Sequence, residues 1–118
     1  MSPIRQGEIF WADLDPVKGR EQRGRRPVLV LTRDGINRLP LTVLVMVGTG
    51  AEHHQMQQYP SDLWVTAVES GLPKDTVFLG LQIRSIDPSR LGSRLGRLPP
   101  DRLTDMWKVI RYLIGDDA

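Results

Sequence analysis

The stretch GEIFWADLDPVKGREQRGRRPVLVL, residues 7–31, contains two apolar runs separated by a basic loop. The runs Ile9–Leu14 and Val28–Leu31 are short and rich in aliphatic or aromatic side chains, which is typical of strands. Asp15-Pro16 is a turn signal, and the loop that follows it holds two glycines. We therefore expect two strands here, joined by a basic loop.

Three further runs have the composition of strands: Leu41–Val47, Leu63–Val68 and Thr76–Ile86. No segment of helical period separates them, so the spacing predicts a mainly β fold, a small antiparallel barrel or a strongly curved sheet.

The C-terminal segment has a different period. Apolar residues recur there every three or four positions, which predicts an amphipathic helix: Leu103, Met106, Trp107, Ile110, Leu113 and Ile114. Gly115 is typical of the position just after a helix. Trp107 falls on the apolar stripe, so we expect it in the core.

The chain has 118 residues, the usual size of one domain, and we expect a single domain over residues 1–118. Its 40% hydrophobic and 25% charged residues exclude a mainly disordered chain. No apolar stretch approaches the roughly 20 residues that cross a bilayer, and residues 1–8 lack the apolar centre of a signal peptide. We expect a cytoplasmic protein without membrane contact. Because cysteine is absent, disulfides and thiolate zinc sites are excluded.

Positive charge is concentrated in one segment. Residues 18–38 contain seven basic and two acidic residues, whereas the whole chain has a net charge of only +2. A second basic group follows later: Arg84, Arg90, Arg94 and Arg97. Arginine predominates in both groups, and its planar guanidinium suits paired contacts with phosphate oxygens. The pattern indicates either a solvated surface or a polyanion-binding surface, with nucleic acid as the first candidate.

Arg26 stands at the junction of the basic loop and the strand after it. Pro27 biases Arg26 towards an extended backbone and itself belongs at a strand start or edge. We therefore expect Arg26 to be held on a stiff support, where a positioned cation can act on a phosphate.

Three blocks of sequence together resemble one family. Residues 7–27 contain Gly-acid-aliphatic, Asp-Leu-x-Pro and Gly-x-Glu-x-x-Gly-x-Arg-Pro, Thr42–Thr49 is an apolar strand that ends at threonine, and Leu79–Asp87 reads Leu-x-x-Gln-Ile-Arg-Ser-Ile-Asp. In these blocks the chain resembles the MazF/PemK toxins, the sequence-specific endoribonucleases of bacterial type II toxin–antitoxin pairs. The likeness covers nearly the whole chain, and only residues 50–70 look unfamiliar.

The resemblance implies a strongly curved SH3-like barrel of the PemK/CcdB type with a C-terminal helix, acting as a homodimer in the cytoplasm. It implies cleavage of single-stranded RNA without a metal or cofactor, by attack of a 2′-hydroxyl that leaves a 2′,3′-cyclic phosphate and a 5′-hydroxyl. Arg26 matches the arginine that stabilises the phosphorane and is a candidate to protonate the leaving oxygen. Thr49 matches the threonine that places the phosphate or the attacking hydroxyl. Glu21 matches the loop acid, as general base or loop organiser. A cognate acidic antitoxin of the MazE type is the implied protein partner.

Six further residues are candidates for RNA binding: Lys18, Arg20, Arg23, Arg25, Gln82 and Arg84. Taken alone, Gln82 also fits a buried scaffolding role. Trp11, Trp64 and Tyr59 fit either base stacking or packing in the core or a dimer interface.

The general base is left open by the sequence. An arginine is an effective charge clamp but a poor proton shuttle, so another group or the substrate itself must handle one proton. His53 and His54 have ordinary pKa values near neutrality, but they match no family motif, and loop histidines are usually solvated. No spacing of histidines and acids matches a known metal site.

Two other function classes compete with RNA cleavage. A CcdB-like poison of DNA gyrase shares the fold type, but such proteins close on Trp-Gly-Ile, whereas this sequence ends Ile-Gly-Asp-Asp-Ala. A small-barrel RNA-binding module without catalysis fits the composition as well. Cleavage of RNA by the wild-type chain distinguishes an RNA-cleaving enzyme from an RNA-binding module without catalysis.

Overall fold

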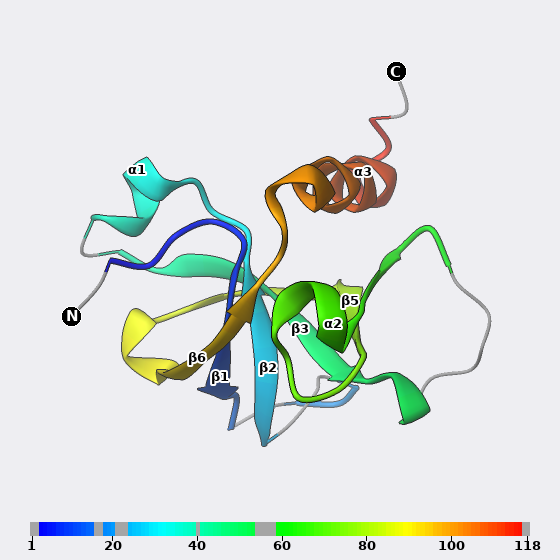
Figure 1. Ribbon diagram of the computed structural model, residues 1–118. Coiled ribbons are helices and arrows are strands. Elements are labelled where there is room, and N and C mark those ends of the chain that lie inside the picture. Colours follow the sequence, from blue (N-terminus) through cyan, green and yellow to red (C-terminus); the bar gives the residue numbers. More distant parts are fainter. Residues whose placement is uncertain (1–2, 16–17, 21–23, 40, 54–58, 117–118) are drawn as a thin grey trace.

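The computed structural model describes residues 3–15, 18–20, 24–39, 41–53 and 59–116 (Figure 1). Its strands are β1 (Glu8–Asp13), β2 (Arg25–Val30), β3 (Val43–Gly50), β4 (Asp62–Val65), β5 (Thr76–Ile86) and β6 (Leu91–Arg97). Its α-helices are α1 (Asp34–Asn37), α2 (Ala67–Ser70) and α3 (Leu103–Ile114). Short 3-10 turns are η1 (Ala51–His53), η2 (Pro88–Arg90) and η3 (Pro100–Arg102).

The six strands form one antiparallel sheet in the order β4-β5-β3-β2-β1-β6. Register shifts in the β1–β6 and β3–β5 pairs mark irregularities at which the sheet bends. The expected mainly β fold with a C-terminal helix is confirmed. In the described ranges no ladder joins β4 to β6, so the sheet is strongly curved without being closed by hydrogen bonds.

Helix α2 lies between the two outer strands of the sheet. Gly96 of β6 lies so close to it that a Cβ there would be 2.2 Å from the carbonyl oxygen of Ser70. Because glycine has no side chain, the backbone of β6 packs directly against α2. This packing stands in the place of a β4–β6 hydrogen-bond ladder, which would close the sheet. The ends of the curved sheet are bridged by backbone packing.

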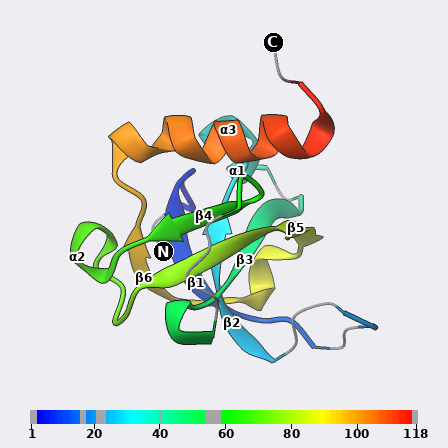
Figure 2. The same ribbon diagram turned by 90° about the vertical axis from the view of Figure 1, so that its right-hand side faces the viewer.

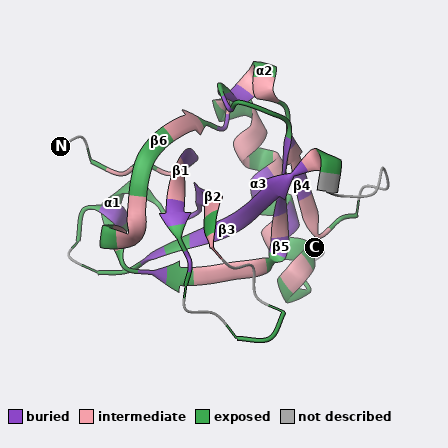
Figure 3. Cartoon of the chain, turned by 90° about the horizontal axis from the view of Figure 1, so that it is seen from below, coloured by how far each residue is buried: buried purple, intermediate pink, exposed green. Residues whose placement is uncertain are grey.

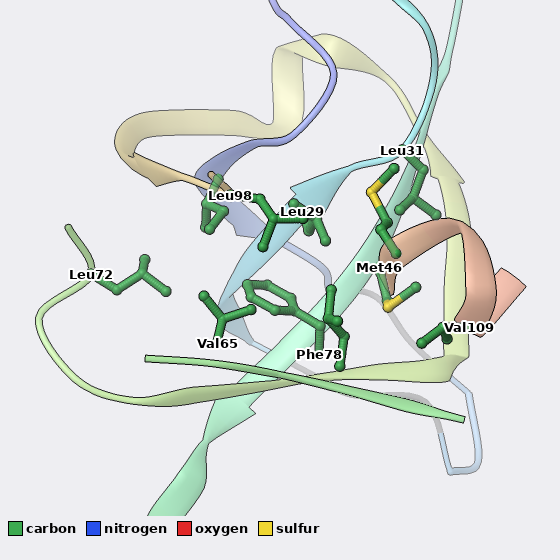
Figure 4. Close-up of a cluster of buried hydrophobic side chains, with 11 residues drawn as sticks. Leu29, Leu31, Met46, Val65, Leu72, Phe78, Leu98 and Val109 are labelled. Carbon is green, nitrogen blue, oxygen red and sulfur yellow. The ribbon is translucent and has the colours of Figure 1, made fainter. Parts of the chain in front are cut away.

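Alternate residues of the central strands face two separate clusters of buried side chains. On β2, Leu29 belongs to the cluster beneath α3, whereas Val28 and Val30 belong to the cluster on the other face. Figure 3 shows β3 buried along most of its length, and Figure 4 shows the first cluster around Phe78. This explains the unbroken apolar runs, because a strand covered on both faces needs apolar side chains in both directions.

Helix α3 lies across one side of the sheet, as Figure 2 shows. Met106 and Val109 are its buried residues, and Gly115 ends the helix in a left-handed conformation as expected. The prediction that Trp107 lies in the core is wrong, because this side chain is 42% exposed. The buried face is centred on Met106 and Val109, which leaves Trp107 at the edge of the apolar stripe.

Two elements differ from the sequence prediction. The expected strand Leu63–Val68 ends at Val65, because Thr66 caps α2 through a reciprocal capping box with Glu69. Strand β6 was not expected, because its sequence LGSRLGR lacks an aliphatic run. Its side chains are half-buried or exposed, so little hydrophobic signal marks it. No helix in the described ranges is long and apolar enough to cross a membrane.

Candidate active site

Arg26 and Thr49, the two residues expected at the phosphate, line the same pocket. They come together because β2 begins where β3 ends. Val28 is opposite Val47 in the antiparallel ladder. Arg26 is two residues before Val28 and Thr49 two residues after Val47, so the antiparallel direction carries both towards the same end of the sheet, where both line the pocket. Thr49 is buried with 8% of its surface exposed, and Arg26 is half-buried. A hydroxyl and a guanidinium therefore meet at one end of the sheet.

The pocket has a volume of about 230 Å³ and two kinds of lining. Its polar side chains come from β2, the end of β3, the start of β5 and the segment before β5: Arg25, Arg26, Thr49, Lys74 and Thr76. Its apolar surface comes mainly from Trp11, Pro27, Leu72, Pro73 and Leu95. A pocket with cationic side chains on one part and apolar surface on another suits a phosphate joined to a nucleobase.

Trp11 and Arg25 form a stacked pair in this pocket. The guanidinium carbon of Arg25 lies 5.5 Å from the centre of the Trp11 ring, within the range of a cation–π interaction. Trp11 is half-buried and lines the pocket. The two roles considered for its side chain, packing and base stacking, would therefore both take place at this pocket.

The described part of the basic loop is held at its base and along its length. Leu14 donates its backbone N–H to the Gly24 carbonyl at 3.0 Å, which closes the loop. Gln82 of β5 donates through Nε2 to the Arg20 carbonyl at 3.2 Å, so this half-buried side chain supports the loop. Lys18 and Arg20 are exposed on it. Glu21 and Arg23 lie outside the described residues.

The second group of arginines is divided between two places. Arg84 donates to the carbonyl of Leu14 at 3.4 Å, and Arg90 donates to the carbonyls of Asp13 and Asp15 at 3.3 and 3.1 Å. Both guanidiniums therefore brace the start of the basic loop. Arg94 instead pairs with the buried carboxylate of Glu8 on β1.

Asp87 begins the 3-10 turn η2. Its carboxylate accepts the backbone N–H of Ser89 at 2.8 Å, and this hydrogen bond, with the nearby Arg90, holds the pKa of Asp87 below its ordinary value. Asp87 therefore caps the start of η2.

Lys74 is a pocket residue that the sequence analysis missed. Its Nζ lies 2.6 Å from Oε1 of Glu52, which follows the end of β3 in η1. The sequence around it, Gly-Leu-Pro-Lys-Asp, indicates a turn and carries no sign of a binding site. Only the folded chain brings Lys74 to Arg26 and Thr49.

Among the described residues that line the pocket, none is a histidine. His54 lies outside the described residues, and His53 belongs to the turn η1. Among the residues that the structure describes, no three histidines or acids come close enough together to hold a metal ion.

A larger pocket of about 490 Å³ lies at Ile4, Phe10 and Leu91. None of the catalytic or RNA-binding candidates lines it. We therefore take the smaller pocket as the candidate active site, because it gathers the groups that phosphate chemistry requires.

Comparison with known proteins shows the family of this chain. Residues 5–114 match the family described as PemK-like, MazF-like toxin of type II toxin–antitoxin system. The curated protein Endoribonuclease MazF from Staphylococcus saprophyticus is 33% identical over 112 residues, which are 95% of this chain and 92% of that protein.

Solved structures share the fold. MazF from Deinococcus radiodurans superposes with a TM-score of 0.79 and 28% identity, covering 98% of this chain and 99% of the other. An endoribonuclease from a mycobacterial species, solved in complex with its cognate antitoxin, has a TM-score of 0.72 at 17% identity, covering 98% and 96% of the two chains. This second likeness concerns the fold alone. With a family match over residues 5–114, the chain belongs to the PemK-like, MazF-like toxins of type II toxin–antitoxin systems, whose curated relative is an endoribonuclease.

Proposed function

We propose that this toxin cleaves single-stranded RNA at specific sequences without a metal ion. In the proposed reaction, the 2′-hydroxyl of a ribose attacks the adjacent phosphorus and the bond to the 5′-oxygen of the next nucleotide breaks. The products are a 2′,3′-cyclic phosphate and a free 5′-hydroxyl. The observation that carries the proposal is the shared pocket of Arg26 and Thr49 at the end of the sheet.

Arg26 is proposed to stabilise the pentacoordinate phosphorane. Negative charge builds up on the non-bridging oxygens as the 2′-oxygen attacks, and a preorganised guanidinium favours that charge over the ground state. Thr49, buried beside it, is proposed to orient the phosphate or the attacking hydroxyl through its own hydroxyl.

Two protons must move in this reaction. One leaves the 2′-hydroxyl, and one arrives at the 5′-oxygen of the leaving group. We assign acceptance of the first proton to Glu21 or to a phosphate oxygen of the substrate. The same group, or solvent water in exchange with it, then gives a proton to the leaving 5′-oxygen. The Glu21→Gln variant distinguishes the two routes. A guanidinium gives up its proton only far above neutral pH, so Arg26 is assigned charge stabilisation as its main role.

The experiment is cleavage of a long RNA of mixed sequence by the purified chain in excess EDTA. We expect discrete cuts whose new ends carry cyclic phosphate. Arg26→Ala is expected to reduce the rate at least about 10²- to 10³-fold, because one preorganised stabilising group is lost. Arg111→Ala, which removes an exposed arginine of α3 outside the pocket and outside both basic groups, is the matched control and should cut at the wild-type rate.

Two outcomes would contradict the proposal. A folded wild-type chain that leaves RNA intact would favour a binding module without catalysis. A folded Arg26→Ala variant that cuts at the wild-type rate would remove Arg26 from the mechanism.

We extend the proposal to location and partners: a cytoplasmic homodimer that an acidic antitoxin inhibits. Seven basic residues against two acidic ones in residues 18–38 would attract an acidic extended segment as strongly as an RNA backbone. Such a segment would compete with RNA for the arginines of the loop. Loss of RNA cleavage on adding an acidic antitoxin tests this.

A further inference from the structure

The segment between α2 and β5 forms one wall of the active-site pocket with Leu72, Pro73 and Lys74. Leu72 is 5% exposed and packs in the core cluster with Val65 and Phe78 (Figure 4). On the other side of Lys74, the carbonyl of Asp75 accepts the backbone N–H of Ala51 at 3.0 Å. Both sides of Lys74 are therefore anchored, and its side chain extends from an ordered backbone.

The carboxylate of Glu52 holds the ammonium of Lys74. Their 2.6 Å ion pair is about half exposed, with 57% of the Lys74 side chain and 52% of the Glu52 side chain accessible. Exposed ion pairs of this kind add little to folding stability. The pair is thus better suited to place a charge than to stabilise the fold.

Gly50 explains why this carboxylate lies beside the active-site threonine. A Cβ on Gly50 would be 2.6 Å from both carboxylate oxygens of Glu52, so the carboxylate folds back over a position that has no side chain. Gly50 directly follows Thr49 and also lines the pocket. Glu52 therefore draws Lys74 towards the same end of β3 at which Arg26 and Thr49 meet.

We infer that Lys74 is a second phosphate-binding residue of the site, taking the RNA phosphate next to the one that is cleaved. The inference depends on the proposed RNA cleavage. A lysine is a mobile point charge that binds phosphate without the fixed paired geometry of arginine. On RNA binding, a phosphate replaces Glu52 as the partner of Lys74, and the apolar surface of Leu72, Pro73 and Trp11 covers the nucleotide between the two phosphates.

The test measures cleavage kinetics and, with an RNA carrying 2′-deoxyribose at a mapped cut site, binding at several salt concentrations. We expect Lys74→Gln to raise KM about ten-fold with a smaller change in kcat, because a contact made before and during the reaction is lost. The slope of log affinity against log salt should become shallower by about 0.7, the value for one phosphate of a single strand. Lys74→Arg should restore most of the affinity.

Two further variants separate binding from a structural role. Glu52→Gln should lower KM two- to three-fold, because no carboxylate then competes with the phosphate. Lys108→Gln, on an exposed position of α3 outside this pocket, is the matched control and should leave KM and the salt slope unchanged.

Lys74→Gln with wild-type KM and salt slope would overturn the inference while leaving RNA cleavage in place. An equal rise in KM for Lys74→Gln and Glu52→Gln would also overturn it, because it would mean that the intact ion pair matters for structure. A wild-type chain that cuts no RNA contradicts the proposed function, and this inference with it.

Discussion

Whether a glycine of this fold can be replaced depends on which neighbouring atom the added Cβ would meet. At Gly96 a Cβ would meet the backbone carbonyl oxygen of Ser70 at 2.2 Å, and a backbone atom cannot move aside alone. At Gly50 the same atom would meet the carboxylate of Glu52 at 2.6 Å, which is the far end of an exposed side chain. Two approaches that are both shorter than 3 Å therefore have different consequences.

We expect Gly96→Ala to lower the free energy of unfolding by about 1–3 kcal/mol, the usual cost of overpacking. Gly50→Ala should cost less than about 1 kcal/mol, because the Glu52 carboxylate can swing into solvent. Urea denaturation of both variants checks this. Equal midpoints for Gly96→Ala and the wild type would show that β6 and α2 separate readily.

Among the elements, α2, β4 and α3 are joined by one arginine. Arg102 donates to both carboxylate oxygens of Glu69 on α2 at 2.7 and 2.8 Å, and to the Trp64 carbonyl on β4 at 2.8 Å. It also pairs with Asp105 of α3 at 2.8 Å. Arg102 and Glu69 are each about a quarter exposed, so this network is partly shielded from solvent. It holds the short helix α2 against the long one.

This network makes folding stability depend on acid pH. Burial raises the pKa of Glu69, but hydrogen bonds from the Thr66 backbone, from Arg102 and from the Thr66 hydroxyl, with the charge of Arg102, outweigh it and lower the pKa below 4.5. A carboxylate with a lowered pKa stabilises the fold above its unfolded-state pKa and loses that contribution as pH falls through the folded value.

We therefore expect the melting temperature to fall as pH is lowered from about 5, and Glu69→Gln to flatten part of this dependence. At neutral pH, Glu69→Gln should cost about 1–3 kcal/mol, since it weakens charge-assisted hydrogen bonds. Thermal melts between pH 3 and 7 measure both effects. Asp101→Asn, which removes an exposed carboxyl from η3, is the control and should keep the wild-type profile. A Glu69→Gln profile parallel to the wild type would remove Glu69 from the acid response.

At the scale of the whole molecule, the net charge is small but the basic residues are concentrated in particular segments. The net charge is only +2, yet residues 18–38 hold seven basic and two acidic residues. From this first basic group Arg25 and Arg26 line the pocket, whereas Arg84 and Arg90 of the second group brace backbone carbonyls. The two basic groups of the sequence therefore have different roles in the structure.

The proposed homodimer predicts a particle of twice the 13.4 kDa chain mass. Light scattering of the purified chain, at concentrations that span the cleavage assay, measures this mass. We expect the doubled mass to persist in Arg26→Ala, because that change is confined to the pocket. A single-chain mass at concentrations where RNA is cut would contradict the dimer and show that one chain suffices.

Local patterns in the amino-acid sequence predict the strands with continuous apolar runs, the C-terminal helix and the junction of loop and strand at Arg26. Those features follow from local periodicity, turn residues and proline, which act over a few neighbouring residues. The sequence did not predict strand β6, because this strand lacks an apolar run. It did not predict the exposure of Trp107 either, because that depends on which face of α3 packs against the sheet.

Which distant residues share the site depends on how the folded chain brings its strands together. Thr49 reaches Arg26 through the register of β2 and β3, and Lys74 reaches both because the chain returns after α2 to the end of β3. Gln82 and Arg84 support the loop through backbone carbonyls more than 60 residues away in sequence. Such partners are selected by the bending of the sheet, and a carbonyl carries no side-chain signature that sequence could reveal.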